Sequence, residues 1–238
     1  MRNKMIDLIR YLKKLGYLKD PRIEAAMMEL DRADFVSSEV RDRAYEDIAL
    51  LSFGSSGKVC STSTQPSLLV TMIEELGMRD EDRVLDLGTG TGFCACILGK
   101  MAKKGSVITV EKDREVASVA SRNFERYRMK NVRLVIGDGR YGYESDAPYD
   151  KIISTVALSG MSEVLFSQMK IGGRCVSPIY RSYMDTPVFL FERTDDTTLK
   201  VSEITGAVFM VAEESEPDPI YHNREFSLRL TDGRFQII

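Results

Sequence analysis

Apolar positions near the start of the chain recur with the spacing of an α-helix. The first series ends before Gly16 and consists of Met5, Ile6, Ile9, Leu12 and Leu15. Asp20 followed by Pro21 has the chemistry of an N-cap and a first helical position, and predicts a second helix. A further amphipathic helix is predicted by a series that ends at Gly77, namely Leu69, Met72, Ile73 and Leu76. We therefore expect a helical N-terminal region over the first sixty or so residues.

Beyond Gly77 the apolar pattern changes to short β-rich runs that alternate with helical stretches. The runs are RVLDLG, SVITVE, VRLVIGD and YDKIIST, with helices expected over residues 93–101 and 114–128. This alternation indicates right-handed crossovers and an α/β fold with a parallel, doubly wound sheet. The chain past Gly173 is strand-rich, with RCVSPI, TPVFLFER, ITGAVFMVA and FSLRLTDGRFQII. Asp232-Gly233 is a hairpin-type turn, so we expect antiparallel strands at this end of the sheet.

Composition favours a globular protein. The chain has 238 residues, of which 43% are apolar and 29% charged, enough for one sizeable core. No apolar run approaches the roughly 20 residues that span a bilayer, and charges are spread through the N-terminal segment MRNKMIDLIRYLKK, so we expect a cytoplasmic protein. The net charge of −3 gives no support to an extended nucleic-acid surface.

The cysteines and the histidine offer little for a metal site. The four cysteines contain no CxxC pair, and the single histidine, His222, lies far from them in sequence. We expect buried, reduced thiols.

A glycine-rich turn follows the predicted strand VLDL. The sequence GTGTG places Gly88, Gly90 and Gly92 where the chain must turn sharply and let a ligand approach the backbone at the start of a helix. In open α/β sheets ligands bind at this edge, outside the carboxyl ends of the strands. The spacing differs from the G-x-G-x-x-G of dinucleotide-binding proteins, and no Lys-Ser/Thr pair follows as in a P-loop. The sequence therefore disfavours both of these phosphate-binding motifs.

Carboxylates accompany the ends of three successive predicted strands. Asp86 precedes the glycine turn, Glu111 closes the next strand at the usual position of a ribose ligand, and Asp138 ends VRLVIGD. Each has a structural alternative: a turn residue for Asp86, an exposed charge for Glu111 and an Asx-turn for Asp138. Together with the glycine turn they predict a site for a cationic or hydroxyl-rich ligand.

This combination resembles the class I S-adenosylmethionine-dependent methyltransferases. The resemblance narrows to the protein-L-isoaspartate O-methyltransferase family and runs from near the N-terminus to about residue 180. The stretches that carry it are ELDRADFV, AYEDIAL, TQPSLLVTMIEEL, DRVLDLGTGTGF, GDG, APYDKIIST and LFSQMKIGGRCVSPI. It implies S-adenosyl-L-methionine as cofactor, bound by Asp86, Gly88, Thr89, Gly90, Gly92, Glu111, Lys112, Asp138 and Gly139. It implies one domain with three parts: a helical region with a substrate loop (residues 1–66), a Rossmann-like cofactor core (67–180) and strands that complete the sheet (181–238).

The hydroxyl-rich stretch CSTSTQP, residues 60–66, aligns with the family's G-Q-T-I-S loop. The alignment places Thr64 at the serine that holds the isoaspartyl carboxylate, and makes Thr64 the candidate catalytic residue. Thr62 and Thr155 are the other candidate substrate contacts. A purely structural role for Thr64 is an N-cap of the helix that begins near Pro66, and cap and contact are compatible.

By the resemblance, the substrates are isoaspartyl proteins or peptides, with neither a membrane nor a nucleic acid as partner. The chain departs from the family at TVALSG (residues 155–160) and at GAVFMVAEE (206–214), two regions that line the substrate cleft in relatives. Two alternatives stay open: a methyltransferase with a changed substrate, RNA or a small molecule, and a non-catalytic cofactor-binding protein. Tyr221, His222 and Arg224 either reach the cleft or belong to a loop. The acidic stretch ESEPDP (214–219) predicts a solvated loop.

Overall fold

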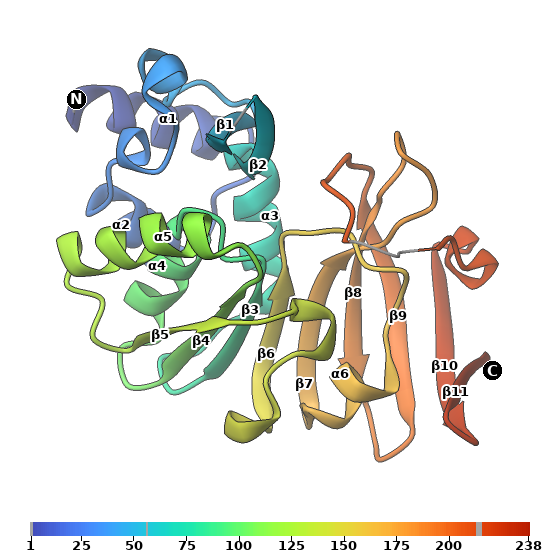
Figure 1. Cartoon of the computed structure of the whole chain (residues 1–238). Coiled ribbons are helices and arrows are strands. Elements are labelled where there is room, and N and C mark those ends of the chain that lie inside the picture. Colours follow the sequence, from blue (N-terminus) through green and yellow to red (C-terminus); the bar gives the residue numbers. More distant parts are fainter. Residues whose placement is uncertain (1, 56, 213–215) are drawn as a thin grey trace.

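A mixed β-sheet organises the fold. The computed structural model describes residues 2–55, 57–212 and 216–238, and over these residues the large sheet has nine strands in the order β11-β10-β9-β8-β7-β6-β3-β4-β5. Figure 1 shows this sheet running across the molecule, with the N-terminal helices gathered at the end that carries β3, β4 and β5. None of the described helices combines the length and apolar character needed to cross a bilayer.

One half of the sheet is parallel. Its strands are β5 (Val132–Ile136), β4 (Ser106–Glu111), β3 (Arg83–Leu87), β6 (Tyr149–Ser154) and β7 (Met169–Pro178). Helix α4 (Phe93–Met101) connects β3 to β4, and α5 (Arg114–Arg126) connects β4 to β5. The prediction of a parallel, doubly wound sheet is confirmed, and all five carboxyl ends of these strands meet at one edge.

The other half of the sheet is antiparallel, as predicted. Its strands are β8 (Val188–Arg193), β9 (Thr198–Thr205), β10 (Glu225–Thr231) and β11 (Arg234–Ile237). Asp232 and Gly233 form the expected hairpin turn, with φ of 49° and 75°. The expected strand over ITGAVFMVA is only partly present: β9 ends at Thr205, within this stretch, and residues 206–210 have no regular structure. They are held instead by single backbone bonds, such as Ala157 N–H to the Met210 carbonyl at 2.8 Å.

The N-terminal region contains the expected helices. They are α1 (Arg2–Lys14), α2 (Pro21–Met28), the short 3₁₀ turns η1 (Arg32–Asp34) and η2 (Ser38–Arg43), and α3 (Pro66–Leu76). Asp20 caps α2 as predicted, because its carboxylate accepts the Arg22 backbone N–H at 2.8 Å. Gly77 ends α3 in the left-handed conformation, also as predicted.

A hairpin interrupts this helical region and was not predicted. Strands β1 (Leu50–Ser55) and β2 (Lys58–Ser63) pair antiparallel, with Leu50 opposite Ser63. The segment expected to be a substrate loop is therefore mostly a strand. Figure 1 shows the hairpin beside the N-terminal helices and close to α3.

Two apolar clusters fill the two faces of the sheet. The larger combines residues of α1, α2, α3 and α4 with sheet residues such as Val84 and Ile153. The smaller lies on the other face, under short elements: η3 (Gly139–Tyr141), η4 (Glu144–Asp146), α6 (Glu163–Ser167) and η5 (Pro219–His222).

Tyr221 belongs to this second cluster and is 2% exposed, so it neither reaches the cofactor cleft nor lies exposed on a loop. Its hydroxyl accepts the Met161 backbone N–H at 2.8 Å. Of the ESEPDP stretch, residues 214 and 215 lie outside the described residues, and His222 and Arg224 are exposed.

Candidate active site

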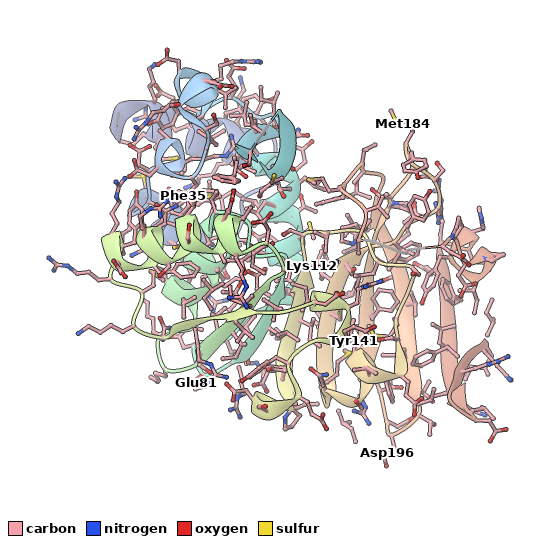
Figure 2. The ribbon with its side chains drawn as sticks, viewed as in Figure 1. Phe35, Glu81, Lys112, Tyr141, Met184 and Asp196 are labelled. Atoms are coloured by element: carbon pink, nitrogen blue, oxygen red, sulfur yellow. The ribbon has the colours of Figure 1, made fainter. Side chains whose placement is uncertain are left out.

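A cleft opens at the carboxyl ends of the parallel strands. Its walls come from β2, from the glycine turn after β3, and from the ends of β4, β5 and β6. The structure brings ten of the predicted site residues to this one cleft: Thr62, Thr64, Gly88, Thr89, Gly90, Glu111, Lys112, Asp138, Gly139 and Thr155. Figure 2 places Lys112 near the middle of the molecule, between the helical side and the antiparallel half of the sheet. Asp86 and Gly92 lie behind the wall.

The glycine turn has a conformation that other residues rarely adopt. Gly90 has φ of 54°, and a Cβ there would lie 3.0 Å from the Ser61 Oγ of the hairpin. Gly92 has φ of 96° and begins α4; a Cβ there would meet the Phe124 ring at 2.7 Å. The glycines thus allow both the sharp turn and the close approach of the hairpin and of α5.

Glu111 supports the turn from the end of β4. Its Oε2 accepts the Gly90 backbone N–H at 2.8 Å, and its Oε1 accepts the Asp113 backbone N–H at 3.0 Å. Burial raises the pKa of the Glu111 carboxyl, although these backbone bonds oppose the shift. The interpretation of Glu111 as an exposed charge is therefore wrong. A carboxylate has about four acceptor positions, so Glu111 can still accept a hydrogen bond from a ligand hydroxyl.

Asp86 is fully buried beneath the turn. Its Oδ2 accepts the Thr109 hydroxyl at 2.7 Å, and the Thr109 and Thr89 hydroxyls lie 2.6 Å apart. In the described part of the chain Oδ1 has no hydrogen-bond partner of regular geometry, although the Cys94 thiol interacts with the carboxylate. Burial raises the pKa of Asp86 to about 7. A buried carboxylate with an unpartnered oxygen is a site for a cation or a hydrogen-bond donor.

Asp138 forms both an Asx-turn and an ion pair. Its Oδ1 accepts the Arg140 backbone N–H at 3.0 Å, and its Oδ2 lies 2.6 Å from the Arg140 guanidinium. This guanidinium holds the pKa of the Asp138 carboxyl below its ordinary value. The Asx-turn interpretation is confirmed, and Asp138 also lines the cleft, beside Gly139.

The four hydroxyls of CSTSTQP divide according to the two faces of β2. Ser61 and Ser63 are buried at 7% exposure each. Ser61 accepts the Ser52 hydroxyl at 2.8 Å, and Ser63 accepts Nε of Arg32 at 3.3 Å. Thr62 points the other way and is exposed, because successive side chains of a strand alternate. All four hydroxyl residues line the cleft, but the serine hydroxyls are bound within the protein, to Ser52 and to Arg32.

Thr64 is not the cap of α3, contrary to the expectation. The N-cap position belongs to Gln65, whose side chain makes no capping bond, and Pro66 is the first helical residue. The Ser67 backbone N–H donates instead to Oδ1 of Asp47 at 2.8 Å. The Thr64 hydroxyl makes no hydrogen bond to another described residue, so it is available to a ligand in the cleft.

Thr155 has a supporting role in the wall. Its hydroxyl donates to the Gly88 carbonyl at 2.8 Å and so ties the end of β6 to the glycine turn. It lines the cleft, but its proton is already used within the protein.

Arg32 and Asp47 were missed at the level of sequence. Arg32 lies within ELDRADFV and is fully buried, and Asp47 lies within AYEDIAL. The only signal was that both belong to stretches that carry the family resemblance.

Comparison with protein families gives one broad match. The model of the family described as protein-L-isoaspartate(D-aspartate) O-methyltransferase matches residues 3–216. A protein-L-isoaspartate O-methyltransferase of Methanopyrus kandleri is 34% identical over 216 residues, which cover 89% of this chain and 93% of that protein. A protein of the same name from Thermotoga maritima is 39% identical over 187 residues. That match covers 77% of this chain, and the chain spans 58% of the Thermotoga relative.

Comparison with solved structures gives the same family. A structure of a protein-L-isoaspartate O-methyltransferase superimposes with a TM-score of 0.82 at 36% sequence identity. The match covers 95% of this chain and 71% of that one.

Proposed function

Because the chain belongs to the protein-L-isoaspartate(D-aspartate) O-methyltransferase family, we propose that it methylates the carboxylate of L-isoaspartyl residues in damaged proteins, with S-adenosylmethionine as methyl donor. The substrates under this proposal are isoaspartyl proteins of the cytoplasm. One observation carries it: the Thr64 hydroxyl, which no described residue binds, lines the same cleft as the glycine turn and Glu111.

The donor set of the cleft fits the cofactor that the family uses. S-adenosylmethionine has an ammonium group and ribose hydroxyls, and it supplies a methyl group activated by a sulfonium. Asp86 is buried directly behind the wall of the cleft, where its charge favours a cationic group on the cleft side, and the Glu111 carboxylate can accept from hydroxyls. A Cβ at Gly139 would lie 3.4 Å from Leu87, so this turn is packed closely against the end of β3. We assign Asp86, the glycine turn, Glu111, Lys112 and the Asp138-Gly139 turn to the cofactor.

The residues near Thr64 suit a carboxylate substrate. An isoaspartyl carboxyl group has an ordinary pKa near 4, so it is ionised at neutral pH and needs no general base to act as a nucleophile. What the protein must supply is alignment and exclusion of water. The Thr64 hydroxyl can donate a hydrogen bond to one carboxylate oxygen and leave the other free to attack. The N-terminus of α3, which begins two residues later, favours the negative charge.

Thr62 and Thr155 have lesser roles in this proposal. Thr62 is exposed at the cleft and can contact the polypeptide around the damaged residue. The Thr155 hydroxyl is already bound to Gly88, so Thr155 shapes the wall rather than binding the substrate carboxylate.

A pair of peptides tests the proposal. We expect the purified chain to methylate an isoaspartyl peptide and to leave its aspartyl counterpart unmodified, with S-adenosyl-L-homocysteine binding measured in parallel. Cofactor binding without turnover on either peptide would favour the changed substrate, RNA or a small molecule. Absence of both turnover and cofactor binding would favour the non-catalytic interpretation.

A further inference from the structure

Arg32 is a buried arginine whose guanidinium binds backbone carbonyls from two segments. Its side chain is 0% exposed. Nη1 donates to the carbonyls of Ala44 at 3.0 Å and Glu46 at 3.2 Å. Nη2 donates to the carbonyls of Ile48 at 2.9 Å and Thr64 at 3.1 Å.

Further bonds fix the end of β2 to the same guanidinium. Nε donates to the Ser63 hydroxyl at 3.3 Å, and Nη2 donates to the Ser63 carbonyl at 3.4 Å. Arg32 thereby joins η1, the segment 44–48 and the end of β2 at the point where Thr64 begins. A planar fork with five N–H donors can hold this many acceptors in one fixed geometry.

The charge of Arg32 has no direct ion pair among the described residues. Burial lowers the pKa of Arg32 to about 10, and the Asp47 carboxylate opposes the shift. Asp47 is bound in turn to the N-terminus of α3, through Ser67. A buried cation held mainly by carbonyls is costly, so it is expected only where the geometry that it fixes is useful.

We propose that Arg32 is a positioning residue for methyl transfer: by binding the carbonyls around Ser63 and Thr64, it holds the Thr64 hydroxyl in line with the cofactor cleft. This inference rests on the proposed function of Thr64. Arg32 itself touches neither cofactor nor substrate, because it lies behind β2 and does not line the cleft. A displacement of Thr64 by about 1 Å is enough to lower the rate about a hundredfold.

Arg32→Lys is the variant that tests the proposal. Lysine keeps the charge but has no fork, so it can satisfy only part of the acceptor set. We expect kcat on the isoaspartyl peptide to fall about ten- to a hundredfold. The dissociation constant for S-adenosyl-L-homocysteine should change less than about threefold, because no cofactor contact is touched.

Arg193 provides a matched control. It also binds backbone carbonyls through its guanidinium, at 2.6 Å to Met169 and 3.1 Å to Phe166, but it does so away from the cleft. Figure 2 shows the neighbouring Asp196 at the lower end of the molecule, well separated from Lys112. Arg193→Lys should lower the melting temperature and leave kcat within about twofold. Equal kcat for the two lysine variants would overturn the proposal.

A double-mutant cycle separates positioning from general destabilisation. If Arg32 acts through Thr64, Arg32→Lys should lower kcat by less than about threefold in the Thr64→Ala background. A full, additive loss in that background would contradict the proposal. Should Arg32→Lys fail to fold, Ser63→Ala removes one acceptor of Nε, and a several-fold fall in kcat is expected.

Hydrogen–deuterium exchange gives a readout that is independent of activity. In Arg32→Lys, amide exchange over residues 44–48 and 61–64 should accelerate about tenfold, while residues 88–92 keep their rate. Unchanged exchange at the end of β2 would overturn the positioning role even if the unmodified chain is active. Accelerated exchange with no turnover by the unmodified chain would instead overturn the proposed function and leave the structural link intact.

Discussion

The Asp47 carboxylate accepts the backbone N–H of Ser67 at 2.8 Å, so a residue 20 positions upstream caps helix α3. The oxygen takes the place that a local N-cap side chain would fill, at the second residue of the helix. The bond ties the segment before the hairpin to the helix after it. It also explains why Thr64 needs no capping role.

Removal of this cap should lower stability without directly removing a cleft residue. We expect Asp47→Ala to reduce the free energy of unfolding by about 1–2 kcal/mol, because it loses the cap and the carboxylate nearest Arg32. Asp42→Ala, in the exposed turn η2, is the control and should change it by less than about 0.5 kcal/mol. Urea denaturation monitored by circular dichroism measures both. A larger loss in Thr64→Ala than in Asp47→Ala would contradict the assignment of the cap.

The errors made from sequence around this helix have a physical origin. Whether Thr64 or Asp47 caps α3 depends on the fold of residues 48–66, and the local sequence pattern contains no information about that fold. Strand β2 was missed because its inward positions are the serines Ser61 and Ser63, which bury hydroxyls against partners rather than apolar groups. The usual alternation of apolar and polar residues is therefore absent from it.

Asp86 should make the stability of the cofactor-free protein depend on pH. Burial raises the pKa of this carboxyl to about 7, above the ordinary value of 3.8. Between about pH 4 and pH 7 the folded protein keeps a proton that the unfolded chain has lost, so this contribution to stability falls as pH rises. Asp86→Asn removes the titration. Its stability relative to the unmodified protein should rise by roughly 2–4 kcal/mol from pH 4 to pH 8.

The same carboxylate should make cofactor affinity depend on pH in the opposite sense. The charge of ionised Asp86 behind the wall favours a cationic ammonium in the cleft, so affinity for S-adenosyl-L-homocysteine should increase as pH rises through about 7 and then level off. Isothermal titration calorimetry with Asp86→Asn should give weaker binding, by about tenfold or more at pH 8, and little pH dependence. An unmodified protein whose affinity is flat from pH 6 to pH 8 would rule out this role.

Glu111 should contribute to the cofactor site in two ways. In the unmodified protein the two Glu111 oxygens accept the backbone N–H groups of Gly90 and Asp113. Glu111→Gln replaces one of these oxygens by an amide NH₂, which cannot accept, so one of the two backbone bonds is lost. It also removes the charge that strengthens hydrogen bonds from ligand hydroxyls. We expect affinity for S-adenosyl-L-homocysteine to fall about ten- to a hundredfold. Glu115→Gln, on the exposed surface of α5, is the control and should bind normally.

The glycine turn should tolerate no side chain at Gly90. Its φ of 54° is strained for other residues, and a Cβ would press against Ser61 Oγ at 3.0 Å. Gly90→Ala should therefore displace the hairpin from the turn and weaken cofactor binding at least tenfold. The double variant with Ser61→Gly removes the clash but not the strain, and should recover only part of the affinity. Full recovery would show that contact with the hairpin alone matters.

The fold and the family could be predicted from sequence because their signals are local. The period of apolar residues changes at Gly77. The glycine turn directly follows the predicted strand that contains Asp86, and Glu111 ends the next strand. The parallel sheet, the antiparallel extension and the family are confirmed. The individual roles of the cleft residues stay predictions. Arg32 could not be found this way, since an arginine in sequence indicates a solvated charge and only the fold buries it.

Thr64 stands where the family has serine, and its variants measure how the cleft uses a hydroxyl. We expect Thr64→Ser to keep or raise kcat, because the hydrogen bond survives and the methyl group that restricts χ1 is removed. Thr64→Val should lower kcat about a hundredfold while cofactor affinity and melting temperature stay close to those of the unmodified protein. A Val variant with unchanged kcat would assign the substrate carboxylate to another group.

The most direct test of the account is the initial rate of methyl transfer from radiolabelled S-adenosylmethionine to an isoaspartyl peptide and to the same peptide with a normal aspartyl residue. We predict incorporation into the isoaspartyl peptide that saturates with peptide concentration, and none above background into the aspartyl peptide. Binding of S-adenosyl-L-homocysteine without incorporation into the isoaspartyl peptide, or equal rates on both peptides, would contradict the proposed function.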